Sequence, residues 1–550
     1  MIAQPASNQL PPRTDSLWPI CYRTALLLLF AWAAWQRFSL PLTPIADPDT
    51  WQYLSPALHK LTGAEFVGTY GRSFLYPGFL YLILSAFGDF RAIGVVQHLL
   101  GLAAGAILLL IWRRLRIFVP NSLVDPRLLD FIGLGGAAIF LLAAETILIE
   151  MRLRPEGICG FLISVNLWFA VQFVSYSFLQ RRRTAALVCG IALVLTCFLL
   201  ALVRPSFWFS TAIVAVPVVA FFLRQAWWPE KIALAVAIPL SGTLILWPEH
   251  LLSRKDRMSQ TFLPTMLFVI HADLIRDQMA ADLKDNATLP YPREWLEGVY
   301  TRLNSEIAKS HAKNPTRYQS LNFDPEYLWF EPSSISGQLQ REFGRDVSGL
   351  CAFYRFYYWR TWQREPFRAL QKIVRQFSIY YFPGCPAYNA IKFWPLTDAY
   401  EQGISTLDLK DYRKIAISYP AASYFALDVR SLARDAPVVE QPRLIRLNLS
   451  ILAVTWLPLL LLAMFVSAVI FYRPARWKRL RWLAASILFG YAYTASCVLE
   501  VAIVNSLEVH RYVTVQMSAT LLTQLLALWL ILEFILDIRQ RHRAAPASRL

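Results

Sequence analysis

Two carboxylates stand in the string Asp47-Pro-Asp-Thr-Trp-Gln-Tyr53, a few residues after the first long apolar run of the chain. A charged group beside hydrocarbon is costly unless it faces water or a partner, so this acidic pair is a candidate functional site. A carboxylate there could accept the proton of an attacking hydroxyl group, and the oxygens of Asp47 and Asp49 also suit Mg²⁺ or Mn²⁺. A solvated loop with an incidental Asp-x-Asp explains the same string equally well.

Further charged residues occupy the short polar stretches between apolar runs. Guanidinium groups match phosphate oxygens and stay charged, so arginines near the acidic pair could hold a phosphate leaving group in place. The candidates are Arg72, Glu150, Arg152, Arg154, Glu156, Arg204, Glu508, His510 and Arg511, with Tyr53 and Tyr76 as aromatic neighbours. Each has a structural alternative, because arginines also pair with nearby acids or extend toward the interface, and aromatic side chains anchor helices at membrane surfaces.

The composition is that of a membrane protein. Of 550 residues, 56% are hydrophobic and 17% are charged, which is more apolar side chain than soluble cores of ordinary size can bury. Most of the net charge of +17 lies in short basic clusters between apolar runs. The preference of such clusters for the cytoplasm explains them better than a nucleic-acid groove does. We predict an all-α polytopic membrane protein without a nucleic-acid partner.

Ten apolar runs are long enough to cross a membrane as helices. They cover residues 21–40, 92–112, 128–149, 157–180, 184–203, 205–223, 231–248, 449–472, 482–504 and 512–536. We therefore expect an N-terminal membrane module at 1–248 with about seven spans, a mainly helical extracytoplasmic domain at 249–448, and a C-terminal membrane module at 449–550 with about three spans. Cys351 and Cys385 share the middle part, and the sequence leaves open whether they pair.

The apolar segment Ser73–Gly88 decides the topology. It has about 16 residues, with Pro77 near its start, and is shorter than the roughly 20 residues that a crossing needs. If it lies on the membrane surface, the clusters Arg113–Arg116 and Arg181–Arg183 face the cytoplasm, as do both termini. The loop 41–91 and all the charged candidates then lie on the extracytoplasmic side. This distribution favours an outer-surface site over a transport path, which would place ionisable groups nearer mid-membrane.

In order and spacing, these residues resemble the lipid-linked-sugar glycosyltransferases of the GT-C superfamily, whose branches include protein O-mannosyltransferases and the aminoarabinose transferases of lipid A. The resemblance rests on Asp49 with Tyr53 four residues later, Gly71-Arg-Ser-Phe-Leu-Tyr-Pro-Gly78, Gln97-His-Leu-Leu-Gly-Leu102, Arg154-Pro-Glu156, Arg204-Pro205 and Glu508-Val-His-Arg-Tyr512. It covers roughly residues 1–220 and 490–550. In the superfamily, seven spans also precede a large outer domain.

The resemblance implies a GT-C-type N-terminal module that transfers a sugar from a polyprenyl-phosphate donor to an acceptor hydroxyl, with inversion at the anomeric carbon. It makes Asp49 the general base, and Asp47 an extra carboxylate that could orient the acceptor or help to bind a divalent cation. Donor phosphate contacts fall first to Arg204 and Arg511, then to Arg72 and Arg154. Other substrate contacts are expected from Tyr53, Tyr76, Glu156, Glu508 and His510.

The expected acceptor is a lipid, a glycan or a protein, and the expected location is a bacterial inner or plasma membrane with the active site facing the periplasm or exterior. The chain departs from many members, because Thr50 follows Asp49 where they have Glu, and it lacks the Glu-Lys-Pro-Pro element of the lipid A enzymes around Leu75–Gly78. Aminoarabinose transfer to lipid A is therefore disfavoured.

Two other functions stay open. One is a polysaccharide polymerase or ligase with a pyrophosphate-linked donor, for which the long loop offers His250, His271 and His311. The other is a non-enzymatic lipid or glycan transporter.

Overall fold

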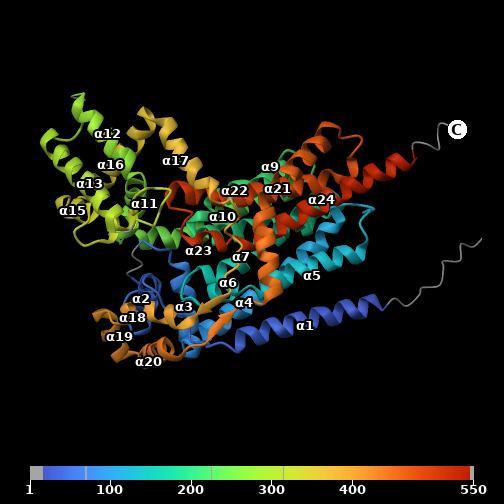
Figure 1. The fold of residues 1–550 in the computed structure, drawn as a ribbon, viewed down its shortest axis with the longest axis horizontal. Coiled ribbons are helices and arrows are strands. Elements are labelled where there is room, and N and C mark those ends of the chain that lie inside the picture. Colours follow the sequence, from blue (N-terminus) through green and yellow to red (C-terminus); the bar gives the residue numbers. More distant parts are fainter. Residues whose placement is uncertain are drawn as a thin grey trace, which may run out of the picture.

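The computed structural model describes residues 17–67, 71–224, 226–254, 256–285, 287–313 and 315–544, and nearly all of its regular structure is helical (Figure 1). The exception in this described part is a short antiparallel pair of strands, β1 (Phe393–Pro395) and β2 (Val438–Glu440), with Trp394 opposite Val439. The prediction of an all-α fold is thus confirmed apart from this pair.

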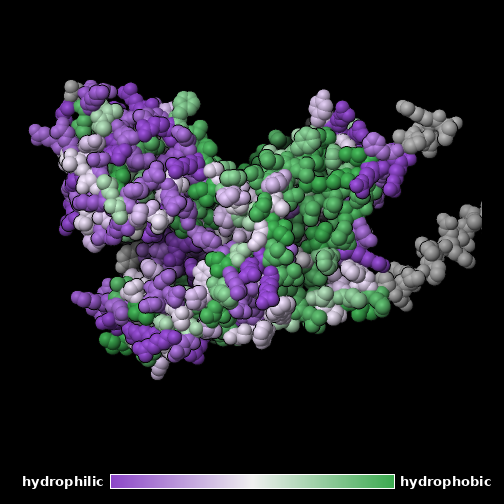
Figure 2. All heavy atoms as spheres, viewed as in Figure 1, coloured by the Kyte–Doolittle hydropathy of each residue, from purple (hydrophilic) through white to green (hydrophobic). Residues whose placement is uncertain are grey.

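Eight of the described helices are long and apolar enough to cross a membrane. They are α4 (Arg91–Leu115), α7 (Glu156–Val174), α8 (Arg183–Val203), α9 (Trp208–Phe222), α10 (Trp228–Ser253), α21 (Arg443–Tyr472), α22 (Arg481–Val504) and α24 (Met517–Ala544). Adjoining 3-10 or π-helical turns extend α4, α7, α9 and α22. On the face seen in Figure 2, apolar side chains cover much of the bundle and form a broad apolar belt. The architecture is that of a polytopic membrane protein.

A ninth crossing is formed if the bent pair α5 (Pro126–Leu142) and α6 (Ala144–Met151) counts as one span. The apolar run predicts one continuous helix here, whereas the structure bends it by 47°. Ala143 adopts an extended conformation, and the Ala144 amide donates a hydrogen bond to Gln441 Oε1 at 2.7 Å instead of continuing the helix. A side chain from a distant segment therefore stabilises the break.

Two apolar helices outside this set bear on the topology. Helix α1 (Trp18–Phe38) matches the first predicted run in length but is not among the eight or nine. Helix α3 (Leu75–Phe87) has 13 residues and is too short to cross, as predicted for the segment around Pro77.

The polar region after α10 folds as two lobes at one end of the bundle (Figure 1). The large lobe comprises α11 (Arg257–Ile270), α12 (Ala272–Lys284), α13 (Arg293–Lys313), α14 (Pro325–Phe330), α15 (Ile335–Glu342) and α16 (Val347–Arg364). The small lobe comprises α18 (Leu396–Leu407), α19 (Lys410–Ser418) and α20 (Pro420–Asp435), and its α18 and α19 pack against α2 (Thr50–Leu61). Helix α17 (Pro366–Ser378) joins the large lobe to the bundle, where α23 (His510–Thr514) leads into α24.

The large lobe has its own hydrophobic core, which is separate from the core shared by the bundle and the small lobe. The start of α1 and the end of α24 lie at the end of the molecule opposite both lobes (Figure 1). Cys351 is in the large lobe and Cys385 follows α17; both thiols are free.

Candidate functional site

The first loop at the lobe end is fixed by backbone contacts with the segment after α6. The Ile45 amide donates to Met151 O at 2.7 Å, and the Leu153 amide donates to Ile45 O at 3.0 Å. Helix α18 closes the other side: Thr406 Oγ1 donates to Asp47 O at 2.9 Å, and a Cβ on Gly403 would lie 2.5 Å from Ala46 O. Two segments far apart in sequence thus hold the acidic loop in one conformation.

Asp47 is buried and has a local structural role. Its Oδ1 accepts hydrogen bonds from the Asp49 amide at 2.9 Å and from Thr50 Oγ1 at 3.3 Å, at the start of α2. Its Oδ2 contacts Arg154 Nε. Both oxygens are therefore engaged within the fold.

Asp49 lies among three guanidinium groups and is more accessible, with 21% of its side chain exposed. Its Oδ2 accepts a hydrogen bond from Arg511 Nη1 at 2.6 Å and lies 3.3 Å from Arg154 Nη2. Its Oδ1 lies 3.7 Å from Arg72 Nη2. A carboxylate and several cations that bind phosphate well thus share one small volume.

A second ion pair adjoins the first. Arg204 Nη1 lies 3.1 Å from Glu156 Oε1, and Arg511 Nε lies 4.0 Å from the same oxygen. Arg204 is buried, yet neither of its Nη atoms has a hydrogen-bond partner among the described residues. Glu156 balances the charge of this guanidinium group and Ser206 accepts from its Nε, while its Nη donors remain available to a further anion.

Aromatic side chains form the walls of this cluster. The guanidinium groups of Arg204 and Arg511 lie over the Tyr512 ring, 4.7 and 5.1 Å from its centroid. Tyr53 and Tyr76 meet edge to face at 5.6 Å, and Arg72 lies 5.5 Å from the centroid of Tyr53. These rings restrict water around the charges and strengthen their interactions.

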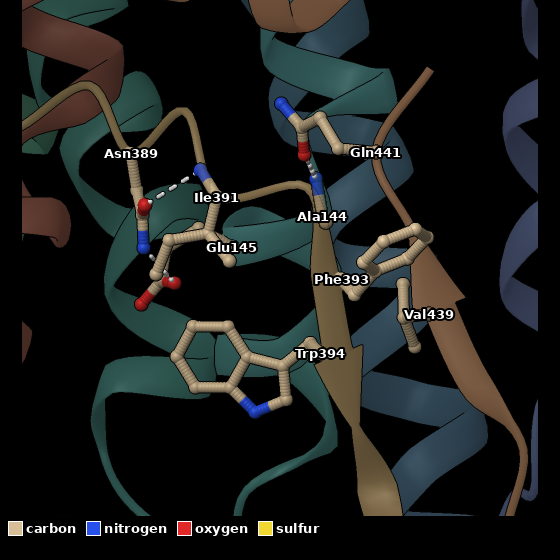
Figure 3. Close-up of a pocket in the computed structure, with 8 residues that line it drawn as sticks. All are labelled: Ala144, Glu145, Asn389, Ile391, Phe393, Trp394, Val439 and Gln441. Carbon is tan, nitrogen blue, oxygen red and sulfur yellow. Dashed lines mark hydrogen bonds between the residues drawn. The ribbon is translucent and has the colours of Figure 1, made fainter. Parts of the chain in front are cut away.

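Two predicted substrate contacts point elsewhere. Glu508 accepts hydrogen bonds from the amides of Gln319 and Ser320, both at 2.8 Å, and so holds a loop of the large lobe. His510 Nδ1 lies 3.4 Å from Glu145 Oε1. Glu145 lines a small pocket beside β1, where its Oε2 accepts a hydrogen bond from Asn389 at 2.9 Å (Figure 3). Of the other candidates, Arg72, Arg154 and Arg511 surround Asp49, whereas Arg204 and Glu156 pair with each other beside Arg511.

The two carboxyls have opposite electrostatic environments. Burial raises the pKa of Asp47 to about 7, with the charge of Asp49 adding to the effect and Arg152 and Arg511 opposing it. Burial also acts to raise the pKa of Asp49, but Arg511 and Arg72 outweigh it and hold that pKa below its usual value. Asp49 is therefore ionised at neutral pH.

One buried ion pair was not predicted from the sequence. Arg37, at the end of α1, donates from Nε and Nη2 to the two Glu150 oxygens, each at 2.8 Å, and His98 Nδ1 lies 2.9 Å from Oε2. A Cβ on Gly101 would lie 1.9 Å from Glu150 Oε1, so only glycine leaves room for this group. The sequence feature that could have indicated this ion pair is the presence of Arg37 inside the apolar run 21–40.

The cluster does not fit a divalent cation. Arg154 and Arg511 occupy the oxygens that Asp47 and Asp49 would offer, and no group of three or more His, Cys, Asp or Glu residues in the described ranges is arranged to hold a metal ion.

Comparison with family models, curated proteins and solved structures finds no match to this chain.

Proposed function

We propose that this chain is an integral-membrane glycosyltransferase of the GT-C type. It would move a sugar from a polyprenyl-phosphate donor to an acceptor hydroxyl at the extracytoplasmic face, with inversion and with Asp49 as general base. The observation that carries the proposal is the partly accessible Asp49 carboxylate among Arg72, Arg154 and Arg511, beside the pair of Arg204 and Glu156. The base and the phosphate-binding groups thus lie within reach of one bound sugar phosphate.

The reaction needs one base and a stabilised leaving group. The acceptor oxygen forms a bond to the anomeric carbon while the bond from that carbon to the phosphate oxygen breaks. The acceptor proton goes to Asp49, and the electron pair of the broken bond leaves with the polyprenyl phosphate. The arginines neutralise the phosphate throughout, and attack from the face opposite the leaving group gives inversion.

Donor binding would also activate the base. In the free enzyme, Arg511 lowers the pKa of Asp49, which weakens it as a proton acceptor. A phosphate competes for Arg511 and Arg154, so its arrival draws these cations away from the carboxylate. The pKa of Asp49 then rises toward the range in which a carboxylate accepts a proton efficiently.

The finer topology forms part of the proposal. We propose ten crossings, which are the eight long helices, the bent pair α5–α6 and α1, in a bacterial inner or plasma membrane with both termini in the cytoplasm. The basic side chains of Arg476, Arg479 and Arg541 support it, because they lie near the end of α24, away from the lobes. The positive-inside preference then places the lobes and Asp49 on the extracytoplasmic side.

A pyrophosphate-dependent polymerase has less support. Burial lowers the pKa of His271 to about 3, so this histidine stays neutral and cannot balance a pyrophosphate. His271 lies against Ile503 O and Tyr358 instead of facing Asp49.

A donor comparison tests the proposed function. The purified chain in vesicles is supplied with an envelope extract as the source of acceptors and with radiolabelled sugars on polyprenyl monophosphate or polyprenyl pyrophosphate. We expect a new glycoside and free polyprenyl phosphate from a monophosphate donor alone. Transfer only from pyrophosphate donors would support the polymerase, and movement of labelled lipid between leaflets without a new glycosidic bond would support the transporter.

A further inference from the structure

Helix α17 presents an apolar face that no described part of the chain covers. Phe367, Leu370 and Val374 lie along this face and are 84%, 51% and 55% exposed, respectively. The spacing of three and four residues places them on one side of the helix. Ala369 and Ile373, on another side, are buried.

The basic residues of α17 hold this face outward. Lys372 Nζ donates a hydrogen bond to Ile270 O at 2.7 Å, and Arg368 Nη2 donates to Asp277 Oδ2 at 2.6 Å. Both acceptors belong to the large lobe. The helix is therefore fixed by its polar side and cannot bury its apolar side by rolling over.

The position of α17 indicates what covers the face. The helix packs on α22 and lies between the large lobe and the ends of the candidate spans (Figure 1). The chain then continues through Phe382, which is 72% exposed, to Cys385, whose amide donates to Ala453 O on α21 at 2.9 Å. Next to Ala453, Val454 belongs to the exposed apolar surface of α21. Exposed apolar side chains thus continue from α17 through Phe382 to Val454 on α21.

We propose that α17 is an interfacial helix whose Phe367, Leu370 and Val374 insert into the lipid leaflet at the lobe end and thereby seat the large lobe on the membrane. An amphipathic helix with an apolar face on one side and basic residues on another binds at the boundary between head groups and acyl chains. This inference concerns the seating of the lobe and does not depend on the glycosyltransferase proposal.

The seated helix also supports the candidate site. Gln376 Oε1 accepts a hydrogen bond from the Leu507 amide at 3.1 Å, and Gln376 Nε2 donates to Ser320 Oγ. Leu507 lies four residues before Arg511, which binds Asp49. Lipid contact at α17 is therefore transmitted to the segment that carries Arg511, and Gln376 acts as a positioning residue.

Photolabelling of the full chain in bilayers tests the seating without any activity measurement. A phospholipid with a diazirine in its acyl chain is activated by light, and labelled residues are located by mass spectrometry. We expect labelling of the 367–374 segment within about threefold of that at Val454 and roughly tenfold above that at Ile417, an 84%-exposed residue of α19 in the small lobe. Labelling of α17 at the level of Ile417 would overturn the proposal.

Matched variants test the link to Arg511. We expect Leu370→Glu to reduce lipid labelling of α17 and to speed amide hydrogen exchange in residues 505–512 about tenfold, whereas Ile417→Glu changes neither. Leu370→Phe should retain both properties, which shows that a substitution at this position is tolerated. Unchanged exchange in Leu370→Glu, with labelling lost, would remove the proposed link while keeping the seating.

Discussion

Asp49 and Asp47 stand two residues apart but have different environments. Asp47 is buried, closes the turn into α2 and contacts Arg154, so its carboxylate is part of the scaffold. Asp49 is partly exposed and is bound by cations that a phosphate could draw away. At the scale of the residue, these contacts support Asp49 as the base and Asp47 as a residue that positions the base.

The raised pKa of Asp47 predicts a distinctive pH dependence of stability. A carboxyl whose pKa rises from 3.8 to about 7 on folding stabilises the folded state at low pH, and this contribution is lost as the pH rises between these two values. Between these two pH values the free energy of unfolding should fall by up to about 1.4 kcal/mol per pH unit, and we expect Asp47→Asn to remove this decline. Denaturant unfolding of the two proteins across that range measures the difference, and parallel curves would contradict the prediction.

Arg204 provides a separate test of phosphate binding. Loss of its guanidinium group in Arg204→Gln should weaken donor binding about 10- to 100-fold, because a hydrogen bond to a charged group contributes about 1.5–3 kcal/mol. Arg204→Lys should restore part of the affinity, since lysine keeps the charge but lacks the planar fork. Arg91→Gln removes an exposed arginine that pairs with Asp428 and serves as the control. Equal donor affinity in all four proteins, including the wild type, would exclude Arg204 from the donor site.

Helix α6 is the element on which the site depends most. It begins at a break fixed by Gln441 and ends close to the segment that carries Arg154 and Glu156. Between these points, Glu150 binds Arg37 of α1 and His98 of α4 in a fully buried cluster. Since breaking a buried ion pair leaves an uncompensated charge, this cluster fixes α6 firmly relative to two neighbouring helices.

We expect Glu150→Ala to destabilise the protein by about 3–5 kcal/mol, because Arg37 is left buried without its partner. The exposed pair of Arg91 and Asp428 is the matched comparison, and Arg91→Ala should cost less than about 1 kcal/mol. Denaturant unfolding of the purified variants measures both effects. Similar small losses in both variants would show that the Arg37–Glu150 pair does not brace α6.

Much of the molecule could be predicted from particular residues. The length of the segment around Pro77 predicted a helix that does not cross, as α3 confirms. The residue types in the loops predicted a cluster of Asp49 with Arg511, although 462 positions separate them. Apolar runs identify the segments that cross the same membrane. The charged residues at the ends of these segments must then lie at the membrane surfaces, where they can meet.

Features that depend on long-range contacts could not be predicted in this way. The break at Ala143 follows from a hydrogen bond to Gln441, and an apolar run carries no sign of such a partner. Glu508 and His510 have residue types suited to the site, yet their side chains bind Ser320 and Glu145. Sequence spacing gives the loop in which a residue lies but not the direction in which its side chain turns.

At the scale of the whole molecule, the proposed topology predicts which surfaces an impermeant reagent reaches. In a Cys21→Ser background, a cysteine introduced by Lys309→Cys in the large lobe should react with an impermeant maleimide in intact cells. One introduced by Arg182→Cys between α7 and α8 should react only after permeabilisation. Both positions are exposed, and of the native cysteines Cys21 is the one that is exposed. Reversed labelling would place the candidate site on the cytoplasmic side.

The most direct test of the central claim compares Asp49→Asn with the wild type and with Asp47→Asn in bilayers supplied with a labelled polyprenyl-phosphate sugar and acceptors. A general base contributes about 10²- to 10⁴-fold, so we predict that Asp49→Asn lowers sugar transfer by at least about 100-fold while the protein stays folded and still binds the donor. Asp47→Asn should retain more activity, because it alters the support of the base and not the base itself. Transfer by Asp49→Asn at the wild-type rate would contradict the assignment of the base.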